Sequence, residues 1–421
     1  MSFQELQLID PLLRAVDLEG YTEPTPIQAQ AIPYILAGRD VLGCAQTGTG
    51  KTAAFALPIL QRLAAGRTDP HPPYIRALIL SPTRELATQI GDSFAAYGRH
   101  TRLKHTVVYG GVGQSPQVKA VQRGVDILVA TPGRLLDLMG QGLIRLEHVE
   151  VFVLDEGDRM LDMGFIHDVR RIIRALPARR QTLLFSATMP PAVQELVRDM
   201  LVDPVKIEVV PQATPVAEVT QAVFFVEKDD KRALLEYLLR DAAITRALVF
   251  TRTKYGADKL AKQLKKARVN ADAIHGNKSQ GAREQALHSF KSGATRVLIA
   301  TDIVARGIDV ENISHVINYD LPNEPESYVH RIGRTARAGS AGVAYSFCAA
   351  DERKYLQDIE RLIRMRVTAV PEHPYTSPLG IPAPTDLRPK NESRQASRGG
   401  SRRSRGRQRS GDRRRLPART R

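Results

Sequence analysis

One stretch of the chain has the residue types and the spacing of a phosphate-binding loop. Gly48, Gly50, Lys51 and Thr52 follow the short strand-like run 40–44 and precede an apolar segment of helical character. Glycines allow backbone N–H groups to turn toward an anion, and the start of a helix adds the positive end of its dipole. The lysine can reach the outer phosphates of a nucleotide, and the threonine hydroxyl can bind Mg²⁺. The stretch therefore predicts a site for a nucleoside triphosphate with its magnesium ion.

The first position of this loop departs from the general pattern, which has glycine where this chain has alanine. The loop consists of Ala45, Gln46, Thr47, Gly48, Thr49, Gly50, Lys51 and Thr52. The alternative interpretation is a Gly-rich surface turn that precedes an ordinary lysine. We favour the phosphate-binding loop because Gly-Lys-Thr lies between a predicted strand and a predicted helix.

A second candidate for chemistry is the acidic segment Asp-Glu-Gly-Asp at 155–158, directly after the apolar run 151–154. An acidic residue at the end of a strand commonly provides the second anchor for the magnesium ion of a phosphate-binding loop. Asp155 would hold the metal through its water shell, and Glu156 would orient or deprotonate the attacking water. The alternative is an acidic cluster at a helix start, which the phosphate-binding loop in the same half of the chain makes less favoured.

These residues need a scaffold that brings the ends of separate strands together. Short apolar runs of strand length recur along the chain, with amphipathic helical segments between most of them. Continuous apolar strands that alternate with helices indicate a parallel sheet covered on both faces. The runs are 77–80, 127–130, 151–154 and 182–185, and then 247–250, 297–300, 316–317 and 343–347.

Between the two sets of runs the pattern weakens, which predicts two α/β domains. The stretch 209–218 contains two prolines and is a linker candidate. We expect a first domain at 1–207, a linker at 208–219, a second domain at 220–370 and a tail at 371–421. The tail is rich in proline at first, and from Glu392 onward it is dominated by Arg, Ser and Gly. Such a segment buries too little apolar surface to offset its ordering entropy, so we expect disorder there.

The positive charge of the chain is concentrated in this tail. The net charge is +16, and residues 388–421 carry 14 basic and two acidic side chains. Residues 1–387 therefore carry only +4. A basic tail indicates a polyanionic partner such as nucleic acid, and the alternative is a tail that only increases solubility.

Composition also bears on location. Cys44 and Cys348 are far apart and lie in apolar runs, so a disulfide framework is not expected. We find no run of 18 apolar residues and no basic, apolar leader at the N-terminus. We therefore expect a cytoplasmic protein that does not associate with membranes.

With the continuation Arg-Met-Leu-Asp-Met-Gly-Phe at 159–165, the chain resembles the DEAD-box ATP-dependent RNA helicases over about residues 1–370. About ten short family motifs occur in the family's order, a combination that chance does not produce. They are at 20–28, 82–86, 110–111, 131–134, 155–158, 186–188, 249–253, 280–283, 301–309 and 330–337. The tail and the run 161–165 look most like the bacterial RhlE branch. The resemblance implies two tandem RecA-like domains.

The resemblance also implies roles for individual residues. ATP binding is implied for Phe3, Tyr21, Thr25, Gln28, Ala45, Gln46, Thr47, Gly48, Thr49, Gly50, Lys51, Thr52 and Asp309. Catalysis is implied for Lys51, Asp155, Glu156, Arg334 and Arg337, and Mg²⁺ binding for Thr52 and Asp155. Coupling of hydrolysis to strand separation is implied for Asp158, Ser186 and Thr188. RNA contact is implied for Pro82, Thr83, Arg84, Gly111, Thr131, Gly133, Arg134, Arg252, Arg283 and Thr301.

Physical reasons support these roles. Gln28 can pair with the N6/N7 edge of adenine, and Tyr21 can stack on the base. Arg334 and Arg337 are three residues apart, so on a helical turn they share a face from which they could reach the γ-phosphate. The RNA-contacting set consists of small, hydroxyl-bearing or arginine residues, which suit backbone contacts with little base readout. Each role has a purely structural alternative. Gln28 could be a polar residue at a helix start, and Arg334 and Arg337 could belong to a solvated basic helix face. The other residues could be ordinary loop or capping residues.

Two positions depart from the family. Gly157 stands where the family has alanine, but the three carboxylates around it keep their spacing. Ala336 stands where the family usually has glycine. If that position needs a positive φ, alanine strains it, and the placement of Arg337 is affected.

The expected function is an RNA-stimulated ATPase and RNA helicase that uses ATP and Mg²⁺ and binds RNA largely without sequence preference. Ribosome-assembly and RNA-decay complexes are candidate partners. A rival from another class is a non-enzymatic RNA-binding or annealing protein that works through its tail. Within the enzyme class, a DNA translocase and an ATP-gated RNA clamp are alternatives.

Overall fold

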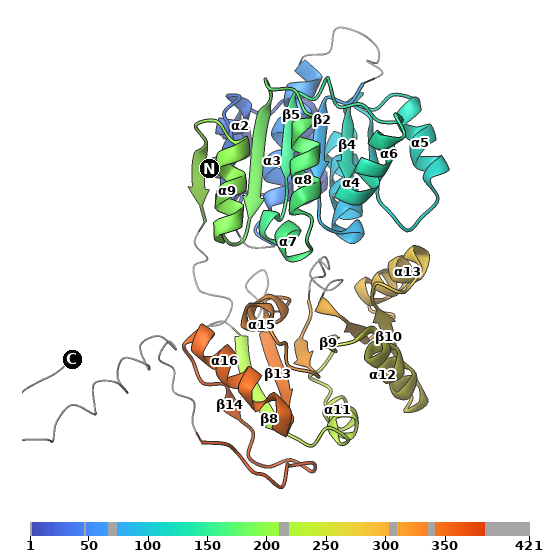
Figure 1. Ribbon diagram of the computed structural model, residues 1–421, viewed down its shortest axis with the longest axis vertical. Coiled ribbons are helices and arrows are strands. Elements are labelled where there is room, and N and C mark those ends of the chain that lie inside the picture. Colours follow the sequence, from blue (N-terminus) through green and yellow to red (C-terminus); the bar gives the residue numbers. More distant parts are fainter. Residues whose placement is uncertain are drawn as a thin grey trace, which may run out of the picture.

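The computed structural model describes residues 2–45, 48–65, 74–209, 219–302, 310, 312–335 and 342–383, and these form two α/β domains in succession (Figure 1). Each domain contains a seven-stranded sheet. Every strand pair in both sheets is parallel. The prediction of two tandem α/β domains with parallel sheets is therefore confirmed. Within the described residues, no helix is both long enough and apolar enough to cross a bilayer.

The first sheet has the strand order β3-β4-β2-β5-β6-β1-β7. Its strands are β1 (Val41–Cys44), β2 (Ala77–Leu80), β3 (His105–Val108), β4 (Ile127–Ala130), β5 (Val151–Leu154), β6 (Gln181–Ser186) and β7 (Val205–Glu208). In this order β5, β6 and β1 are neighbours. Because the strands are parallel, the segments that follow them meet at one edge of the sheet, which is where α/β folds bind ligands.

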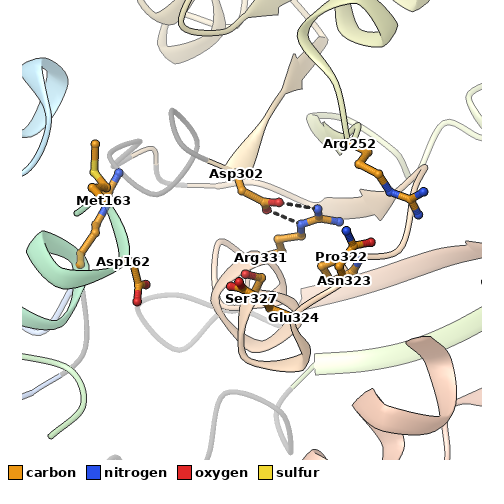
Figure 2. A pocket seen from close by; sticks show the side chains of 10 residues that line it. Asp162, Met163, Arg252, Asp302, Pro322, Asn323, Glu324, Ser327 and Arg331 are labelled. Carbon is orange, nitrogen blue, oxygen red and sulfur yellow. Dashed lines mark hydrogen bonds and ion pairs between the residues drawn. The ribbon is translucent and has the colours of Figure 1, made fainter. Parts of the chain in front are cut away.

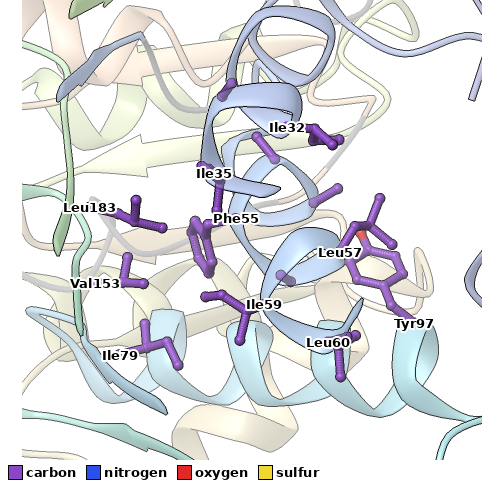
Figure 3. Packing of buried hydrophobic residues seen from close by; sticks show 14 of the residues in the cluster. Ile32, Ile35, Phe55, Leu57, Ile59, Leu60, Ile79, Tyr97, Val153 and Leu183 are labelled. Atoms are coloured by element: carbon purple, nitrogen blue, oxygen red, sulfur yellow. The ribbon is translucent and has the colours of Figure 1, made fainter. Parts of the chain in front are cut away.

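Helices cover both faces of this sheet, because successive strand side chains point to opposite faces. One face packs against η1 (Gln4–Leu6), α1 (Asp10–Leu18), α2 (Pro26–Leu36), α3 (Lys51–Ala65) and α4 (Arg84–Gly98). The other packs against α5 (Gln114–Gln122), α6 (Pro132–Gly140), α7 (Gly157–Asp162), α8 (Ile166–Arg174) and α9 (Pro191–Met200). Figure 3 shows the first of these cores, in which Phe55 of α3 lies against Val153 and Leu183 of the sheet. Helix α3 is thereby anchored in the core, which fixes the phosphate-binding loop at its start.

The second sheet has the strand order β10-β11-β9-β12-β13-β8-β14. Its strands are β8 (Val219–Phe225), β9 (Ala247–Phe250), β10 (Ala271–Ile274), β11 (Val297–Ala300), β12 (His315–Asn318), β13 (Gly342–Cys348) and β14 (Thr368–Ala369). Its helices are α11 (Lys231–Leu238), α12 (Lys254–Lys266), α13 (Gln280–Lys291), α15 (Pro325–Ile332), η2 (Ala350–Glu352) and α16 (Arg353–Ile363). The two domains thus have the same general construction.

Several strands have no continuous apolar run in the sequence and were not predicted. The strands β3, β7, β10 and β14 lie at the edges of the two sheets, and β3 and β7 are partly exposed. An edge strand has solvent on one side and accepts polar residues, as in Val-Lys-Ile-Glu of β7. The inner strand β8, next to the edge strand β14, starts with Val-Thr-Gln-Ala, in which buried residues alternate with more exposed ones and no apolar run forms. An apolar run in the sequence therefore identifies only those strands that are buried on both faces.

The predicted linker and tail differ from the structure at their ends. Glu208 is the last residue of β7 and Val219 the first of β8, so the linker is shorter than 208–219, and residues 210–218 lie outside the described residues. The expected boundary at 370 falls too early. Ser377 is buried, its backbone N–H donates to the Phe225 carbonyl over 2.9 Å, and Arg353 donates to the carbonyl of Gly380 over 2.7 Å. The Pro-rich start of the tail thus packs on the second domain, while 384–421 lie outside the described residues.

Candidate nucleotide site between two domains

The phosphate-binding loop starts at the end of β1, beside the end of β6. The backbone N–H of Ala45 donates to the Ser186 carbonyl over 3.1 Å. Gln46 and Thr47 lie outside the described residues. Gly48 and Gly50 have φ values of 87° and 89°, in the left-handed region that favours glycine. The backbone therefore makes the turn that the sequence pattern predicts.

Lys51 begins α3 and is buried, with only 6% of its surface exposed. Its Nζ donates to the Ala45 carbonyl over 2.8 Å, so the side chain folds back across the loop. Thr52 follows it on the first turn and is half-buried. An ammonium group inside the loop can bind phosphate oxygens once it exchanges this carbonyl for them.

The acidic segment lies at the end of β5, two strands from the loop. Asp155 is buried, and desolvation raises the pKa of its carboxyl to about 7, while the charge of Lys51 opposes this rise. Its Oδ1 accepts the backbone N–H of Glu156 over 3.0 Å. A buried carboxylate that is costly to ionise becomes more stable beside a cation. A cation bound beside Asp155 would therefore stabilise the ionised form of its carboxyl.

Glu156 has a φ of 52°, an uncommon value for a residue other than glycine. Its carboxylate forms an ion pair with Arg159 over 2.6 Å, and both side chains are buried. Sequence reasoning did not single out Arg159, although its position three residues after Glu156 on α7 places the two on one helix face. Arg159 therefore orients the residue proposed as the base.

The three residues expected to couple hydrolysis to strand separation are in contact. Oδ2 of Asp158 accepts both the backbone N–H and the hydroxyl of Thr188, over 2.9 and 2.8 Å. The backbone N–H of Asp158 donates to Oγ of Ser186 over 3.0 Å, and this hydroxyl donates to the Thr188 carbonyl over 2.8 Å. A movement of α7 must therefore move the segment after β6 as well.

Gln28 is buried, and its amide joins the start of α2 to the phosphate-binding loop. Its Oε1 accepts the backbone N–H of Thr25 over 2.9 Å, and its Nε2 donates to the Gly50 carbonyl over 3.1 Å. A Cβ at Gly50 would lie 2.4 Å from this Nε2, so only glycine allows the contact. Each amide atom retains one further hydrogen-bonding site, so pairing with adenine stays chemically open.

The two aromatic residues expected to bind ATP, Phe3 and Tyr21, differ in exposure. Tyr21 is 38% exposed, and its hydroxyl is 3.0 Å from that of Tyr97. Phe3 is only 3% exposed, and its ring lies 6.4 Å from that of Tyr21 between centroids. The Phe3 ring lies in the core beside Tyr21, so its expected part in ATP binding would be indirect, through support of Tyr21.

The opposite wall of the site comes from the second domain. Arg334 is buried, and its Nε donates to the His330 carbonyl over 3.3 Å. It lines a cavity of about 40 Å³ together with Lys51, Glu156, Asp158, Arg159, Asp162, Ala187 and His330. This is far less than the several hundred Å³ that an organic ligand fills, so this cavity could hold only part of a nucleotide. Arg337, Ala336 and Asp309 lie outside the described residues.

A larger cavity of about 350 Å³ adjoins the first and shares Arg159 and Asp162 with it. Figure 2 shows Asp162 and Met163 of the first domain on one side and Arg252 and Arg331 of the second on the other. Arg331 holds Asp302 through two contacts of 2.6 and 2.8 Å. The cavity is polar and lies between the domains, so its shape depends on how they are arranged.

Candidate RNA-contacting residues of the first domain follow β2 and β4. Pro82 is buried, while Thr83 and Thr131 stand at the starts of α4 and α6. Gly111 has a φ of 78°, and a Cβ there would lie 2.0 Å from Nη1 of Arg84, so glycine is required for this approach. The set is completed by Gly133, which is exposed, and Arg134, which donates to the Val112 carbonyl over 3.1 Å.

In the second domain Arg252 is held by a buried ionic network. Its Nη2 donates to Oε1 of Glu352 over 2.9 Å, and its backbone N–H to Oδ2 of Asp320 over 2.9 Å. Oε2 of Glu352 accepts Nζ of Lys231 over 2.6 Å, and Lys231 and Glu352 are both buried. Thr301, at the end of β11, is half-buried. Sequence reasoning missed Lys231 and Glu352, and their separation of 121 residues offers no local signal.

Arg283 is not on an open surface, contrary to the expectation of an RNA contact. Its Nη2 lies 2.6 Å from Oε1 of Glu85, and both side chains are buried. Glu85 belongs to α4 of the first domain and Arg283 to α13 of the second, so the ion pair joins the two domains. In this structure the Arg283 guanidinium group is paired with the Glu85 carboxylate. RNA could bind this group only by displacing that carboxylate.

Replacing Gly157 with alanine should stabilise the protein slightly. The residue is helical and buried, its φ is not positive, and a Cβ would meet only Leu184 and Leu154, at 3.6 and 3.8 Å or beyond. Alanine in a compatible helical position gains roughly 0.5–1 kcal/mol over glycine. Gly157→Ala should therefore raise the melting temperature, while ATP turnover changes by less than about tenfold. A hundredfold rise in turnover, or a clear loss of stability, would contradict this reading.

The chain matches two protein-family profiles in succession. Residues 25–196 match the family described as DEAD/DEAH box helicase, and residues 230–339 match the family described as Helicase conserved C-terminal domain. The DEAD-box ATP-dependent RNA helicase CshA of Bacillus subtilis is 41% identical over 372 residues, which is 88% of this chain and 74% of that protein. The ATP-dependent RNA helicase CshA of Limosilactobacillus reuteri is 43% identical over 369 residues, 87% of this chain and 73% of that protein.

Solved structures are similar over both domains. Dbp5 of S. cerevisiae bound to RNA and ADP BeF3 has a TM-score of 0.77 at 33% identity, covering 88% of this chain and 95% of that chain. A DEAD box protein of the hyperthermophile Methanococcus jannaschii has a TM-score of 0.52 at 40% identity, covering 88% and 99%. The TM-score is higher at the lower identity. The two domains here are therefore arranged more like those of the RNA-bound yeast protein.

Proposed function

Because the chain belongs to the DEAD-box ATP-dependent RNA helicase family, with its two tandem RecA-like domains, we propose that it couples ATP binding and hydrolysis to local RNA duplex unwinding or to remodelling of RNA–protein complexes. The observation that carries the proposal is the cavity between the domains. Lys51 and Glu156 of the first domain and Arg334 of the second all line it. A phosphate-binding lysine, a carboxylate base and an arginine at one point are the parts that phosphoryl transfer needs.

The roles of the nucleotide-binding residues follow from their surroundings. ATP, when bound, supplies the γ-phosphoryl group that water attacks. Lys51 would bind the outer phosphates, and Asp155 with the Thr52 hydroxyl would hold Mg²⁺. Magnesium is usually bound by one or two carboxylates together with phosphates and water, so a single buried carboxylate suits it. Glu156 would hold the attacking water, and Arg334 would stabilise charge on the phosphates. Arg337 and Asp309 are proposed for the same site on sequence alone.

Binding of the two ligands would be linked through closure of the domains. If ATP and RNA each bind best to the closed arrangement, each favours the other by a reciprocal coupling free energy. The contacts of Asp158 with Ser186 and Thr188 support a mechanical connection between the base and the RNA-contacting segments. Dbp5, the similar yeast protein, was solved with RNA bound, which supports RNA as the second ligand here.

RNA-stimulated ATP hydrolysis tests this function. Turnover should rise when RNA is added and should rise much less with DNA of equal length. Unwinding of a short duplex should require ATP. Absence of RNA-stimulated turnover would favour the non-enzymatic annealing protein, equal stimulation by DNA would favour a translocase, and stimulation without unwinding would favour an ATP-gated clamp.

The exact domain bounds, the branch of the family, the location and the partner complexes are proposals. The proposed domains are 1–207 and 220–370, with the second domain extended to 383 by the packing of Ser377. An RhlE-like branch is supported by the basic tail and the run 161–165, whereas the relatives compared above are named CshA. Cytoplasmic location and partners in ribosome assembly or RNA decay remain predictions from the sequence.

Deleting residues 388–421 should weaken RNA binding without loss of the ATPase. The segment carries 14 basic and two acidic residues, and a segment of this charge binds phosphates without sequence preference. Each lost contact removes about 0.7 from the slope of log affinity against log salt for a single strand. The measurement is RNA affinity over a range of salt concentrations for both proteins. An unchanged slope would identify the segment as a solubility tail.

A further inference from the structure

A strong positive charge surrounds α12 in the second domain. Residues 254–278 contain seven basic and two acidic side chains, a net charge of +5. The whole of residues 1–387 carries only +4, so the remainder of that part is close to neutral. Charge of one sign gathered on one helix indicates a surface that attracts a polyanion.

Four exposed side chains form one stripe along this helix, which we name the α12 stripe: Tyr255, Lys259, Lys262 and Lys266. Their spacing of four, three and four residues places them on one face. The opposite face, with Ala257, Leu260 and Leu264, is buried in the core of the second domain. The stripe spans 12 residues, 255–266, which is about 16 Å of helix. The helix can therefore present these groups only to solvent or to a partner.

The lysines of the stripe differ from their basic neighbours. Lys265 pairs with Asp272 over 2.6 Å, Lys278 with Asp258 over 2.9 Å, and Lys254 donates to Asn277 over 3.1 Å. Within the described ranges, no ion pair involves Lys259, Lys262 or Lys266. A lysine in the last turn also complements the helix dipole, but this explains Lys266 and not Lys259 or Lys262. Among the described residues, Lys259 and Lys262 thus have no structural task, and Lys266 has only its interaction with the helix dipole.

The stripe begins three residues after Arg252, one of the proposed RNA-contacting residues of the second domain. Arg252 directly precedes Thr253, whose side chain caps α12. Tyr255, at the start of the stripe, is 74% exposed. Figure 1 shows α12 beside β10 at the outer side of this domain. RNA that leaves the path at Arg252 would therefore meet the tyrosine first and the lysines after it.

We infer that the α12 stripe binds the backbone of RNA that extends beyond the cleft between the domains. Lysines bind phosphates as point charges, without base readout, and an exposed tyrosine can stack on an unpaired base. A membrane surface is not favoured, because the apolar face of α12 is buried in the core. The inference rests on the proposed function, since it extends the RNA path of the same enzyme.

The test replaces Lys259, Lys262 and Lys266 together with glutamine, in the full chain. Glutamine keeps the helix propensity and removes three charges. The matched control replaces three exposed arginines of the first domain, Arg171, Arg174 and Arg179, with glutamine. Both triple variants lose the same net charge. Uridine oligonucleotides of increasing length are the probe, and affinity is measured over a range of salt concentrations.

For oligonucleotides longer than the shortest that fully stimulates the ATPase, the α12 variant should lose about 2 from the salt slope, or about 0.7 for each lysine. Its affinity for the shortest stimulating oligonucleotide and its maximal turnover should equal those of the unchanged protein. A Tyr255→Ala variant should weaken binding of the long RNA only. An unchanged slope in the lysine variant, or an equal loss in the arginine control, would overturn the inference. Failure of the proposed function would appear separately, as lack of RNA-stimulated turnover in the unchanged protein.

Discussion

Lys51→Ala should lower ATP turnover by about 10³-fold or more while the protein stays folded. Removal of one preorganised group that stabilises transition-state charge commonly costs 10²–10³-fold. Lys51 has a second effect, because its charge also lowers the pKa of Asp155. Without it, Asp155 should hold its proton to higher pH and bind magnesium less well near neutrality. The two losses act on the same step, so the decrease should exceed that of a phosphate contact alone.

Steady-state ATPase assays with saturating RNA measure this effect, and a melting curve checks the fold. Lys119→Ala is the matched control, because Lys119 is an exposed lysine of α5 in the same domain. RNA affinity without nucleotide should be nearly the same in both variants, since Lys51 lies in the nucleotide site. Normal turnover in a folded Lys51→Ala protein would exclude the phosphate-binding loop as the site of hydrolysis.

The second large effect is expected for Glu156→Gln, which should reduce turnover by about 10²–10⁴-fold, the range for loss of a positioned general base. Glutamine has the same shape but cannot accept the proton of the attacking water. ATP and RNA should still bind, because Lys51 and the RNA-contacting residues are unchanged. The variant should therefore remain longer in the closed, RNA-bound state, which slow dissociation of RNA in the presence of ATP would show.

Arg159 allows a sharper form of this experiment. If Arg159 acts by orienting Glu156 through their 2.6 Å ion pair, Arg159→Met should also lower turnover. The double variant should then be no slower than Glu156→Gln, because effects on one catalytic unit are not additive. Multiplied losses in the double variant would show that Arg159 acts independently. Melting curves of all three variants separate these effects from the cost of breaking a buried ion pair.

Part of this protein follows from the sequence alone. The strands buried on both faces appear as unbroken apolar runs, because nothing polar fits between two layers of helices. The phosphate-binding loop and the acidic segment can be identified because each is a continuous stretch whose chemistry depends on neighbours in the chain. Contact between the two was expected as well, since parallel strands bring their ends to one edge.

Other features were decided only by the tertiary structure. The edge strands carry polar residues that match a surface loop as well as a strand. The ion pair of Glu85 with Arg283 and the network of Lys231, Glu352 and Arg252 join residues far apart in the chain. Charged side chains are common in every sequence, and only the tertiary structure determines which of them are buried. A buried charge is stable only when it is paired with an opposite charge or hydrogen-bonded. For this reason the candidate RNA-contacting arginines could be named from the sequence, but not the carboxylates that hold two of them in place.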